Sequence, residues 1–277
     1  MSNPNGFTAR KARFLNRVYA RLATRTRAAT GFVSSPEPRT SGSFAKGRQL
    51  VAGNFLFAGY LIEAPDASIW ALKAPNAAFE GDLHGFAWMD DLAAVGDTPS
   101  RASMQSWLWE WIDQFGRGSG AGWTPDLTGR RLIRWINHAL FVLRGQESDR
   151  SDAFYLSLAQ QTTFLSKRWH SASPGLPRFE ALTGLIYAGL SLQGMESLAR
   201  PAIKALAKEC SVQIDSEGGL PTRNPEELLA VYALLTWAAA ALEDAGLEVP
   251  AEHLGAIERI TPTLRTLRHS DGGLARF

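Results

Sequence analysis

Apolar residues recur every three or four positions along most of the chain, which is the spacing of one face of an α-helix. The clearest stripe follows Pro125 and consists of Leu132, Trp135, Ile136, Ala139, Leu140 and Leu143. Thr124 at the N-cap, Pro125 at the first helical position and Asp126 in the first turn are typical of a helix start. The pattern predicts one continuous helix from Pro125 through Leu143.

Similar patterns predict further helices, separated by short turns rich in Gly, Pro and Ser, at residues 84–94, 100–115, 152–171, 178–192, 201–212, 225–245 and 251–267. Short connections of this kind favour antiparallel helical hairpins. Residues 181–192 and 228–242 are apolar on more than one face, as expected of helices inside the molecule. We therefore expect an inner layer of helices covered by an outer one, as in an α/α toroid.

The first quarter of the chain has a different pattern. Residues 29–48 are rich in Ser, Pro and Gly and read as a linker. In residues 49–64 the apolar positions are broken by Gly53 and Gly59, which predicts a short β-hairpin, and residues 68–73 predict a further strand. The expected organisation is a basic N-terminal helix and linker (1–48), a short β region (49–75) and a helical domain (76–277). The fold class is thus mainly α, an incomplete α/α toroid with a short N-terminal β-hairpin region.

Positive charge is concentrated at the N-terminus. Residues 1–50 hold ten Lys and Arg against one acid, Glu37, which gives +9, so the other residues sum to −7 within the whole-chain charge of +2. Apolar residues recur at helical spacing in the same stretch, at Phe14, Leu15, Val18, Tyr19 and Leu22. Such a segment suits contact with a membrane surface or a transit peptide, and equally a first helix with a solvated basic face. No motif accompanies the charge, so nucleic acid is not an expected partner.

Several sequence motifs of common enzyme and membrane-protein classes are missing, which excludes those classes as expectations for this chain. The single cysteine, Cys210, excludes an internal disulfide framework and a cysteine-based zinc site, and we expect it in the core. The five histidines lack metal-ligand spacing, and no P-loop, Rossmann or GxSxG motif is present, so neither a metal nor a cofactor is expected. No signal peptide or apolar run of 18 residues is visible, and Leu234–Leu242 is too short to span a bilayer. These features favour a soluble, cytoplasmic protein.

Three groups of residues are candidates for a site. On the helix after Pro125, Arg131, Arg134 and His138 share a face beside Asn137; arginine binds carboxylates through a fixed fork of donors, and histidine can act as a base. These residues equally suit the solvated face of an amphipathic helix. Among the tryptophans, Trp135 and its neighbours could stack on sugar rings, although core packing is the simpler interpretation.

The third group follows a glycine turn at 218–219. Asn224 and Pro225 are typical of a helix start, which explains Asn224 by capping alone. Capping does not explain Arg223, because a positive charge is poorly placed beside a helix N-terminus. We expect Arg223 to face a ligand or an internal acid.

Several segments together resemble the N-terminal helical domain of the heparinase II/III-like polysaccharide lyases. They are His84–Leu92 (HGFAWMDDL), Gly129–Ile136 (GRRLIRWI), Leu176–Leu190 (LPRFEALTGLIYAGL), Gly218–Glu226 (GGLPTRNPE) and the tail Leu267–Phe277. The resemblance covers nearly the whole chain and rests on diffuse patterns.

The resemblance implies a helical toroid that holds a uronic-acid polysaccharide such as a glycosaminoglycan against a following β-sandwich, for cleavage by β-elimination. In that reaction a polar group neutralises the uronate carboxylate, and Tyr or His removes the C5 proton. For this chain it implies an anionic polysaccharide as partner, and a periplasmic or envelope location as an alternative. The substrate-binding candidates are Arg130, Arg131, Arg134, Arg178, Arg223, Asn224 and Trp135. The catalytic candidates are His138 with Asn137, then Tyr187 or Tyr232.

Two departures from the family pattern leave catalysis open. The Asn-His pair expected near Leu176 is missing, and Leu220 stands where related sequences usually have His. The chain also ends at Phe277, about where the β-sandwich is expected to start, so we expect a domain-only form. The alternatives are a carbon–oxygen lyase, a non-catalytic glycan-binding or structural module, and a scaffold that docks through its basic N-terminal helix. The sequence does not specify the sugar or the oligomeric state.

Overall fold

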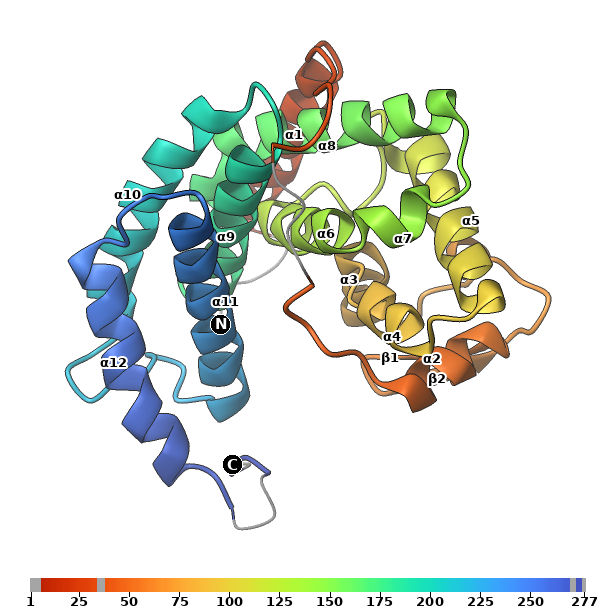
Figure 1. Ribbon diagram of the computed structural model, residues 1–277. Coiled ribbons are helices and arrows are strands. Elements are labelled where there is room, and N and C mark those ends of the chain that lie inside the picture. Colours follow the sequence, from red (N-terminus) through yellow and green to blue (C-terminus); the bar gives the residue numbers. More distant parts are fainter. Residues whose placement is uncertain (1–5, 34–37, 270–272, 276–277) are drawn as a thin grey trace.

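The computed structural model describes residues 6–33, 38–269 and 273–275 (Figure 1). Its first half contains α1 (Phe7–Ala23), α2 (Phe44–Val51), β1 (Asn54–Phe57), β2 (Tyr60–Glu63), η1 (Ile69–Ala71), α3 (Ala77–Gly85), α4 (Trp88–Val95) and α5 (Thr98–Phe115). Its second half contains α6 (Pro125–Asn137), α7 (Ala139–Leu143), α8 (Ser148–Arg168), η2 (Trp169–Ser171), α9 (Leu176–Ser191), α10 (Glu196–Gln213), α11 (Pro225–Asp244) and α12 (Ala251–Thr266). The expected mainly α fold with a short β-hairpin is confirmed.

Helix α9 lies at the centre of the array and packs against α6, α10 and α11. Its side chains are buried on all sides, Phe179, Leu182 and Ile186 among them. A helix that is apolar on all faces is stable only when it is buried inside the molecule. The expected inner helix is therefore confirmed, and α9–α10 and α11–α12 form the expected neighbouring helix pairs.

Two glycines allow α6 and α9 to cross at close range. A Cβ atom on Gly184 of α9 would lie 2.4 Å from the Cα of Gly129 on α6. A Cβ on Gly129 would lie 2.2 Å from the backbone oxygen of Glu180. Real Cβ atoms do not approach so closely, so the crossing requires glycine on both helices. It holds Arg130 and Arg134 on α6 in place over α9 and α4.

Two predicted helices are interrupted, and the second break lies at the candidate site residue His138. The helix expected at 84–94 is divided at Phe86, which adopts a left-handed conformation with φ of 60° and is buried among aromatic rings. The helix expected through Leu143 ends at Asn137, and α7 begins after His138. The break changes the helical phase, so Leu140 is 76% exposed rather than part of the core stripe.

The β-hairpin forms as expected, with Asn54 paired to Glu63 and Phe57 to Tyr60. Its two-residue turn has positive φ at both Ala58 and Gly59, which is the geometry that matches the twist of the flanking strands. The further strand expected at 68–73 is wrong, because Ile69–Ala71 forms a 3-10 helix. The linker expected at 29–48 is also partly wrong, because α2 begins at Phe44.

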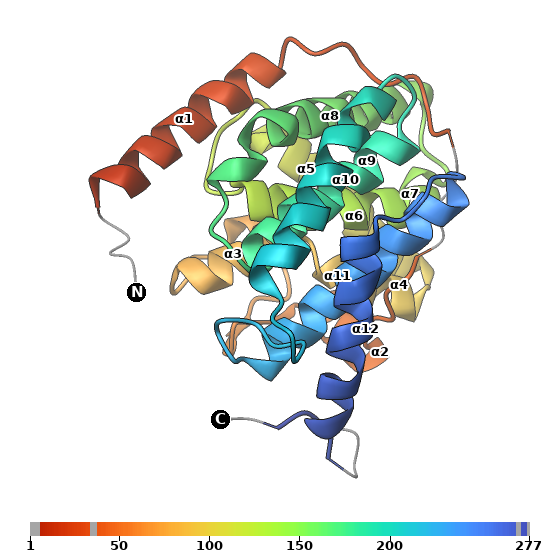
Figure 2. The same cartoon turned by 90° about the vertical axis from the view of Figure 1, so that its left-hand side faces the viewer.

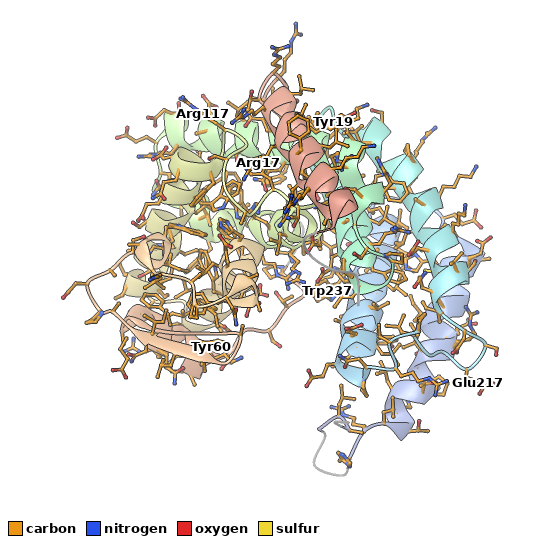
Figure 3. The ribbon with its side chains drawn as sticks, turned by 180° about the vertical axis from the view of Figure 1, so that it is seen from behind. Arg17, Tyr19, Tyr60, Arg117, Glu217 and Trp237 are labelled. Carbon is orange, nitrogen blue, oxygen red and sulfur yellow. The ribbon has the colours of Figure 1, made fainter. Side chains whose placement is uncertain are left out.

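The N-terminal helix α1 lies along the outside of the molecule and packs against α8 (Figure 2). Asn16 of α1 accepts a hydrogen bond of 2.8 Å from Arg168 Nε on α8. Figure 3 shows α1 crossing the back of the molecule with Arg17 and Tyr19 on it. Residues 38–43 run between α11 and α4 before α2 begins (Figure 1).

Among the described residues, helix α11 is long enough and apolar enough to cross a membrane, judged by length and composition alone. The sequence expectation considered only Leu234–Leu242 and missed this longer window. In the structure α11 packs against α9 and α12, with Leu228, Leu235 and Leu242 buried. These contacts are those of a core helix.

Candidate functional site

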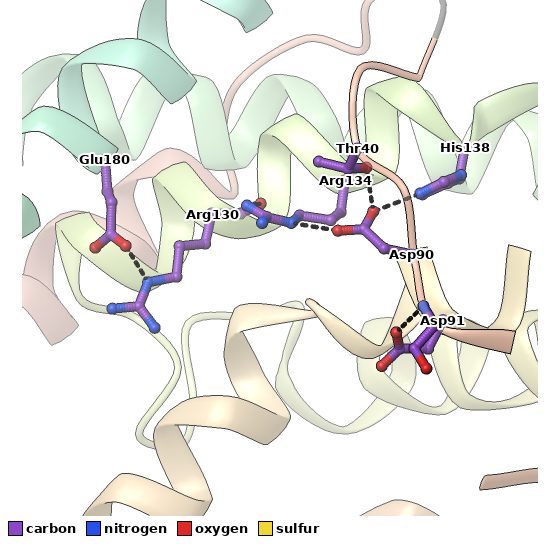
Figure 4. A network of polar contacts seen from close by, with 8 residues as sticks. Thr40, Asp90, Asp91, Arg130, Arg134, His138 and Glu180 are labelled. Carbon is purple, nitrogen blue, oxygen red and sulfur yellow. Dashed lines mark hydrogen bonds and ion pairs between the residues drawn. The ribbon is translucent and has the colours of Figure 1, made fainter. Parts of the chain in front are cut away.

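Four polar residues meet where α4, α6 and the segment before α2 come together (Figure 4). Asp90 accepts from Thr40 Oγ1 at 2.7 Å and lies 2.7 Å from Nε2 of His138 through the same oxygen, Oδ1. Its other oxygen lies 3.4 Å from Nε of Arg134 in an ion pair. We call Asp90, Arg134, His138 and Thr40 the Asp90 cluster. Sequence reasoning found Arg134 and His138 but missed Asp90 and Thr40.

The surroundings keep Asp90 ionised. Burial alone would raise the pKa of Asp90, but the hydrogen bond from His138, the charge of Arg134 and the hydrogen bond from Thr40 outweigh it and hold the pKa below its ordinary value. The carboxylate therefore orients the His138 ring through Nε2. The sequence did contain a signal for Asp90, because it is an acid in the first turn of a mostly apolar helix. An acid at that position is also explained by its favourable interaction with the helix dipole, so the signal did not single out a site.

Asn137 lies beside the Asp90 cluster and has no hydrogen-bond partner among the described residues. It is only 4% exposed, and both its amide oxygen and its amide nitrogen are buried without a hydrogen bond. Asn137, His138 and Asp90 line a hollow of about 550 Å³ together with residues of α4, α7 and the segment before α2. The structure therefore brings the predicted pair Asn137 and His138 together at a hollow.

Two of the predicted binding arginines are neutralised by acids of the chain itself. Arg130 Nε donates to Glu180 at 2.6 Å, as Figure 4 also shows. Arg178 lies 3.5 Å from Glu209 and donates to the backbone oxygen of Ala172 at 2.8 Å. Each guanidinium retains a partly exposed edge. Anions from solution would have to compete with these internal carboxylates.

Arg131 lies in the interior of the molecule, contrary to the expectation that it faces a ligand or solvent. It is 0% exposed, stacks 4.1 Å from the ring of Trp111, and donates to Gln161 and to the backbone oxygens of His84 and Gly122. Burial lowers the pKa of Arg131 to about 9. Its function is to tie α6 to the chain around α3 and α8, so it is corrected from a substrate-binding to a structural residue.

The aromatic candidates also belong to the core. Trp135 is fully buried and stacks on Phe154 at 5.6 Å, so it offers no platform to a sugar. The same holds for the other tryptophans considered, which are buried at Trp88, Trp107, Trp109, Trp111 and Trp123. Core packing is confirmed for this group, and Cys210 is likewise buried as expected.

The two tyrosine candidates occupy different places. Tyr187 is buried on α9, and burial raises its pKa to about 12, although the nearby charge of Arg39 opposes the shift. A phenol with this pKa holds its proton at neutral pH. Tyr232 lies on α11 at a separate hollow of about 290 Å³, where its hydroxyl accepts from Thr261 at 3.4 Å.

Arg223 and Asn224 lie at the start of α11. Asn224 Oδ1 accepts from the backbone N–H of Glu226 at 2.9 Å, which confirms the predicted cap. Arg223 adopts a left-handed conformation with φ of 51° and is exposed. No ion pair of Arg223 occurs among the described residues. The structure therefore places it toward solvent rather than toward an internal acid.

No known protein-family model matches the chain. The chain is 28% identical over 240 residues to the FtsZ-localized protein C of Caulobacter vibrioides, a match that covers 84% of this chain and 40% of that protein. Among solved structures, a mutant of the heparan sulfate lyase HepC from Pedobacter heparinus superposes with a TM-score of 0.61 at 17% identity, covering 99% of this chain and 49% of that one. A heparinase III superposes with a TM-score of 0.65 at 16% identity, covering 97% and 47%.

The chain thus spans about half the length of the solved structures it matches. At this level of identity the superposition defines the fold, and it extends over nearly every helix described above. The incomplete α/α toroid expected from the sequence is confirmed by it. The chain therefore adopts the fold of the heparinase-like helical domain.

Proposed function

We propose that this chain is a lyase-like helical domain that binds an anionic polysaccharide without cleaving it through its own residues. The observation that carries the proposal is the state of His138. The ring is buried, and its Nε2 is held by Asp90 at 2.7 Å. A general base must reach the proton that it removes, and His138 is only 4% exposed.

The second candidate base supports the same interpretation. Tyr187 is buried, with a pKa raised to about 12, so its ionisation at neutral pH would be costly. Related sequences usually have His where this chain has Leu220, and leucine cannot transfer a proton. Binding is therefore better supported than β-elimination.

Arg223 is the best-placed contact for a carboxylate or sulfate. It is exposed and positively charged, and its strained backbone conformation is of the kind that persists at functional sites. The matched solved structures include a heparan sulfate lyase, which favours an anionic sugar polymer as the ligand. Arg130 and Arg178 would add weaker contacts through their exposed edges.

The proposal is tested by two measurements on the purified chain with heparan sulfate, chondroitin sulfate and alginate. Calorimetry should detect binding to at least one polymer, while the ultraviolet absorbance of an unsaturated product should stay at baseline. An absorbance signal that His138→Ala abolishes would instead establish a lyase with its base in this chain. Absence of binding to all three polymers would contradict the binding module.

Arg223→Ala should weaken polysaccharide binding by roughly fivefold, because one charge-assisted contact contributes on the order of 1 kcal/mol at an exposed site. Arg200→Ala is the matched control, since Arg200 is an exposed arginine on α10. Titration calorimetry at low ionic strength compares the two variants. Equal affinity of both variants would remove Arg223 from the site.

A second candidate function, recruitment to a membrane surface, is favoured by the outer face of α1. Phe14 is 66% exposed and Leu22 is 48% exposed, and exposed Arg17 and Arg21 lie beside them on the helix. An apolar stripe flanked by cations suits the interface of an anionic bilayer. The curated relative is named for its localisation with FtsZ, which is consistent with recruitment as a function of such proteins.

Replacing Phe14 and Leu22 together by Ser should abolish co-sedimentation with vesicles that contain phosphatidylglycerol. Both side chains lie outside the core, so the fold should remain intact by circular dichroism. Vesicles of phosphatidylcholine alone provide the charge control, and binding of the native chain should weaken with added salt. Equal sedimentation of the native and variant chains would contradict membrane recruitment through α1.

A further inference from the structure

Residues 38–43, here called the strap, cover the Asp90 cluster. Thr40 Oγ1 donates to Asp90 at 2.7 Å, and the backbone N–H of Ser43 donates to Asp91 at 2.7 Å. Figure 4 shows the strap passing over both acids. The strap therefore supplies hydrogen-bond donors to two carboxylates at the start of α4.

The strap is also attached to the opposite side of the molecule. Arg39 Nη2 donates to Asp244 at the end of α11 at 2.6 Å. In Figure 1 the strap runs between α11 and α4, which belong to the two sides of the helical array. It thus connects the end of α11 with the start of α4.

The strap backbone lies directly on α4. A Cβ atom on Gly42 would lie 1.9 Å from the backbone oxygen of Asp90. Only glycine permits this approach. Gly42, with Pro38, Thr40 and Ser41, also lines the hollow of about 550 Å³, which is the groove beneath the strap.

The hollow combines apolar walls with hydrogen-bonding groups. Its walls are Pro38, Ala93, Ala94, Leu140 and Phe141, and its polar lining includes Thr40, Ser41, Asp90, Asn137 and His138. The amide of Asn137 is buried and unpartnered. Leu140 is exposed at the rim because α6 ends at His138, so the helix break itself forms one wall.

The carboxylates of Asp90 and Asp91 are hydrogen-bond acceptors, and they determine which class of ligand could bind in place of the strap. Carboxylates of Asp90 and Asp91 receive donors from the strap, so a ligand that replaces the strap must present hydroxyl or N–H groups. Arg134 already pairs with Asp90, but displacing the strap would take Arg39 away from Asp244. An anionic ligand would then meet the carboxylates of Asp91 and Asp244, which favours a neutral ligand. A sugar ring offers hydroxyl donors on its edge and an apolar face for Leu140 and Phe141.

We propose that the groove beneath the strap is a binding site for a neutral, hydroxyl-rich sugar, and that Thr40 and Ser43 occupy it as internal competitors. The Thr40 hydroxyl takes the place of a sugar hydroxyl on Asp90, and the Ser43 amide does the same on Asp91. This site is separate from the anion contacts at Arg223 and takes a different class of sugar. Binding requires the strap to move, so the apparent affinity is reduced by the fraction of molecules in which it is closed.

Thr40→Val tests the competition, because valine keeps the shape of threonine and removes the hydroxyl. Loss of one hydrogen bond to a charged group should open the strap about tenfold more often and raise sugar affinity by a similar factor. Thr30→Val is the matched control, since Thr30 donates a hydrogen bond of 2.6 Å to Gln193, outside the groove. The control should leave sugar affinity unchanged.

The experiment uses the full chain and nuclear magnetic resonance, with cellotriose, maltotriose and chitotriose as probes. At least one probe should shift the His138 ring signal and speed amide exchange at Ser43, which reports the loss of its hydrogen bond to Asp91. Thr40→Val should show faster Ser43 exchange without a probe and tighter binding with it. Heparin-derived oligosaccharides should leave both signals unchanged.

Three results would overturn the proposal. The first is that no probe shifts the His138 signal in either the native chain or Thr40→Val. The second is binding that leaves Ser43 exchange unchanged or slower, because the strap would then not be displaced. The third is weaker binding in Thr40→Val, which would make Thr40 part of the sugar site rather than its competitor.

Discussion

At the scale of single residues, Glu180 has an unusual environment for an acid. Its Oε1 accepts from Arg130, whereas Oε2 is buried and receives no hydrogen bond from the part of the chain that the structure describes. Burial raises the pKa of Glu180 from 4.5 to about 7, although Arg130 opposes the shift. Between these values the folded protein binds a proton that the unfolded chain releases. Stability from Glu180 is therefore present below about pH 4.5 and is lost as pH rises toward 7.

His84 acts in the opposite direction. Its Nδ1 accepts from Trp111 at 3.0 Å, and burial, reinforced by the charge of Arg131, lowers the pKa of His84 from 6.5 to about 3. Here the unfolded chain binds the proton more tightly, so stability is lost as pH falls from 6.5 toward 3. The two residues oppose each other between pH 4.5 and 6.5, and the pH profile of the native chain alone cannot separate them.

Glu180→Gln should separate them, because glutamine keeps the acceptor for Arg130 and cannot ionise. The free energy of unfolding of the variant minus that of the native chain should increase by up to about 3 kcal/mol between about pH 5 and pH 8. Urea unfolding at a series of pH values measures this difference, from which the His84 contribution cancels. A difference that is constant with pH would mean that Glu180 ionises normally.

The sequence predicted the role of a residue correctly where its partners are adjacent in sequence, and incorrectly where they come from other helices. Asn224 caps α11 because its partners are the next few backbone N–H groups, which are fixed by sequence. Arg131 was assigned to the surface because its burial depends on Trp111, a neighbour from another helix. Asp90 was missed for the same reason, since its partners come from two other segments, the one before α2 and the end of α6.

At the scale of elements, the crossing of α6 and α9 determines the geometry of the site. Gly129 and Gly184 bring the two backbones together, and Arg130 and Arg134 extend from α6 next to this contact. Tight packing of this kind tolerates little added volume, because neither backbone can move without disturbing its other partners.

Gly184→Ala should lower the free energy of unfolding by about 2 to 4 kcal/mol, because its Cβ would lie 2.4 Å from the Gly129 backbone. Gly255→Ala in α12 is the matched control, since its Cβ would meet only the flexible end of Arg259. The control should be neutral or more stable by up to about 1 kcal/mol, from helix propensity alone. Similar unfolding curves for both variants would show that the crossing has room.

Most helices followed from periodicity, whereas α2 and the breaks in two predicted helices did not. The apolar stripe after Pro125 continued in sequence to Leu143, but His138 leaves the helical conformation where Asp90 binds its ring. Phe86 breaks its helix because tertiary packing among aromatic rings favours the left-handed conformation. Both interruptions arise from contacts distant in sequence, which a local pattern does not contain.

At the scale of the whole molecule, burial decreases from α9 outward to α1. Helix α9 contacts α6, α10 and α11 and buries nearly every side chain. Helix α1 packs on α8 and leaves Phe14 and Leu22 exposed. Amides that are buried on all sides exchange only when the domain unfolds, whereas a helix attached by one face can open alone.

Native-state hydrogen exchange should therefore show the slowest amides in α9 and much faster exchange in α1, at the same pH and temperature. Gly184→Ala should speed exchange in α9 by the factor that corresponds to its loss of global stability, about thirtyfold to several hundredfold for 2 to 4 kcal/mol. The same substitution should leave α1 unchanged, because opening of α1 does not break the α6–α9 crossing. Equal acceleration in both helices would show that α1 unfolds only with the domain, and the amphipathic face of α1 would then have to bind a membrane without separating from α8.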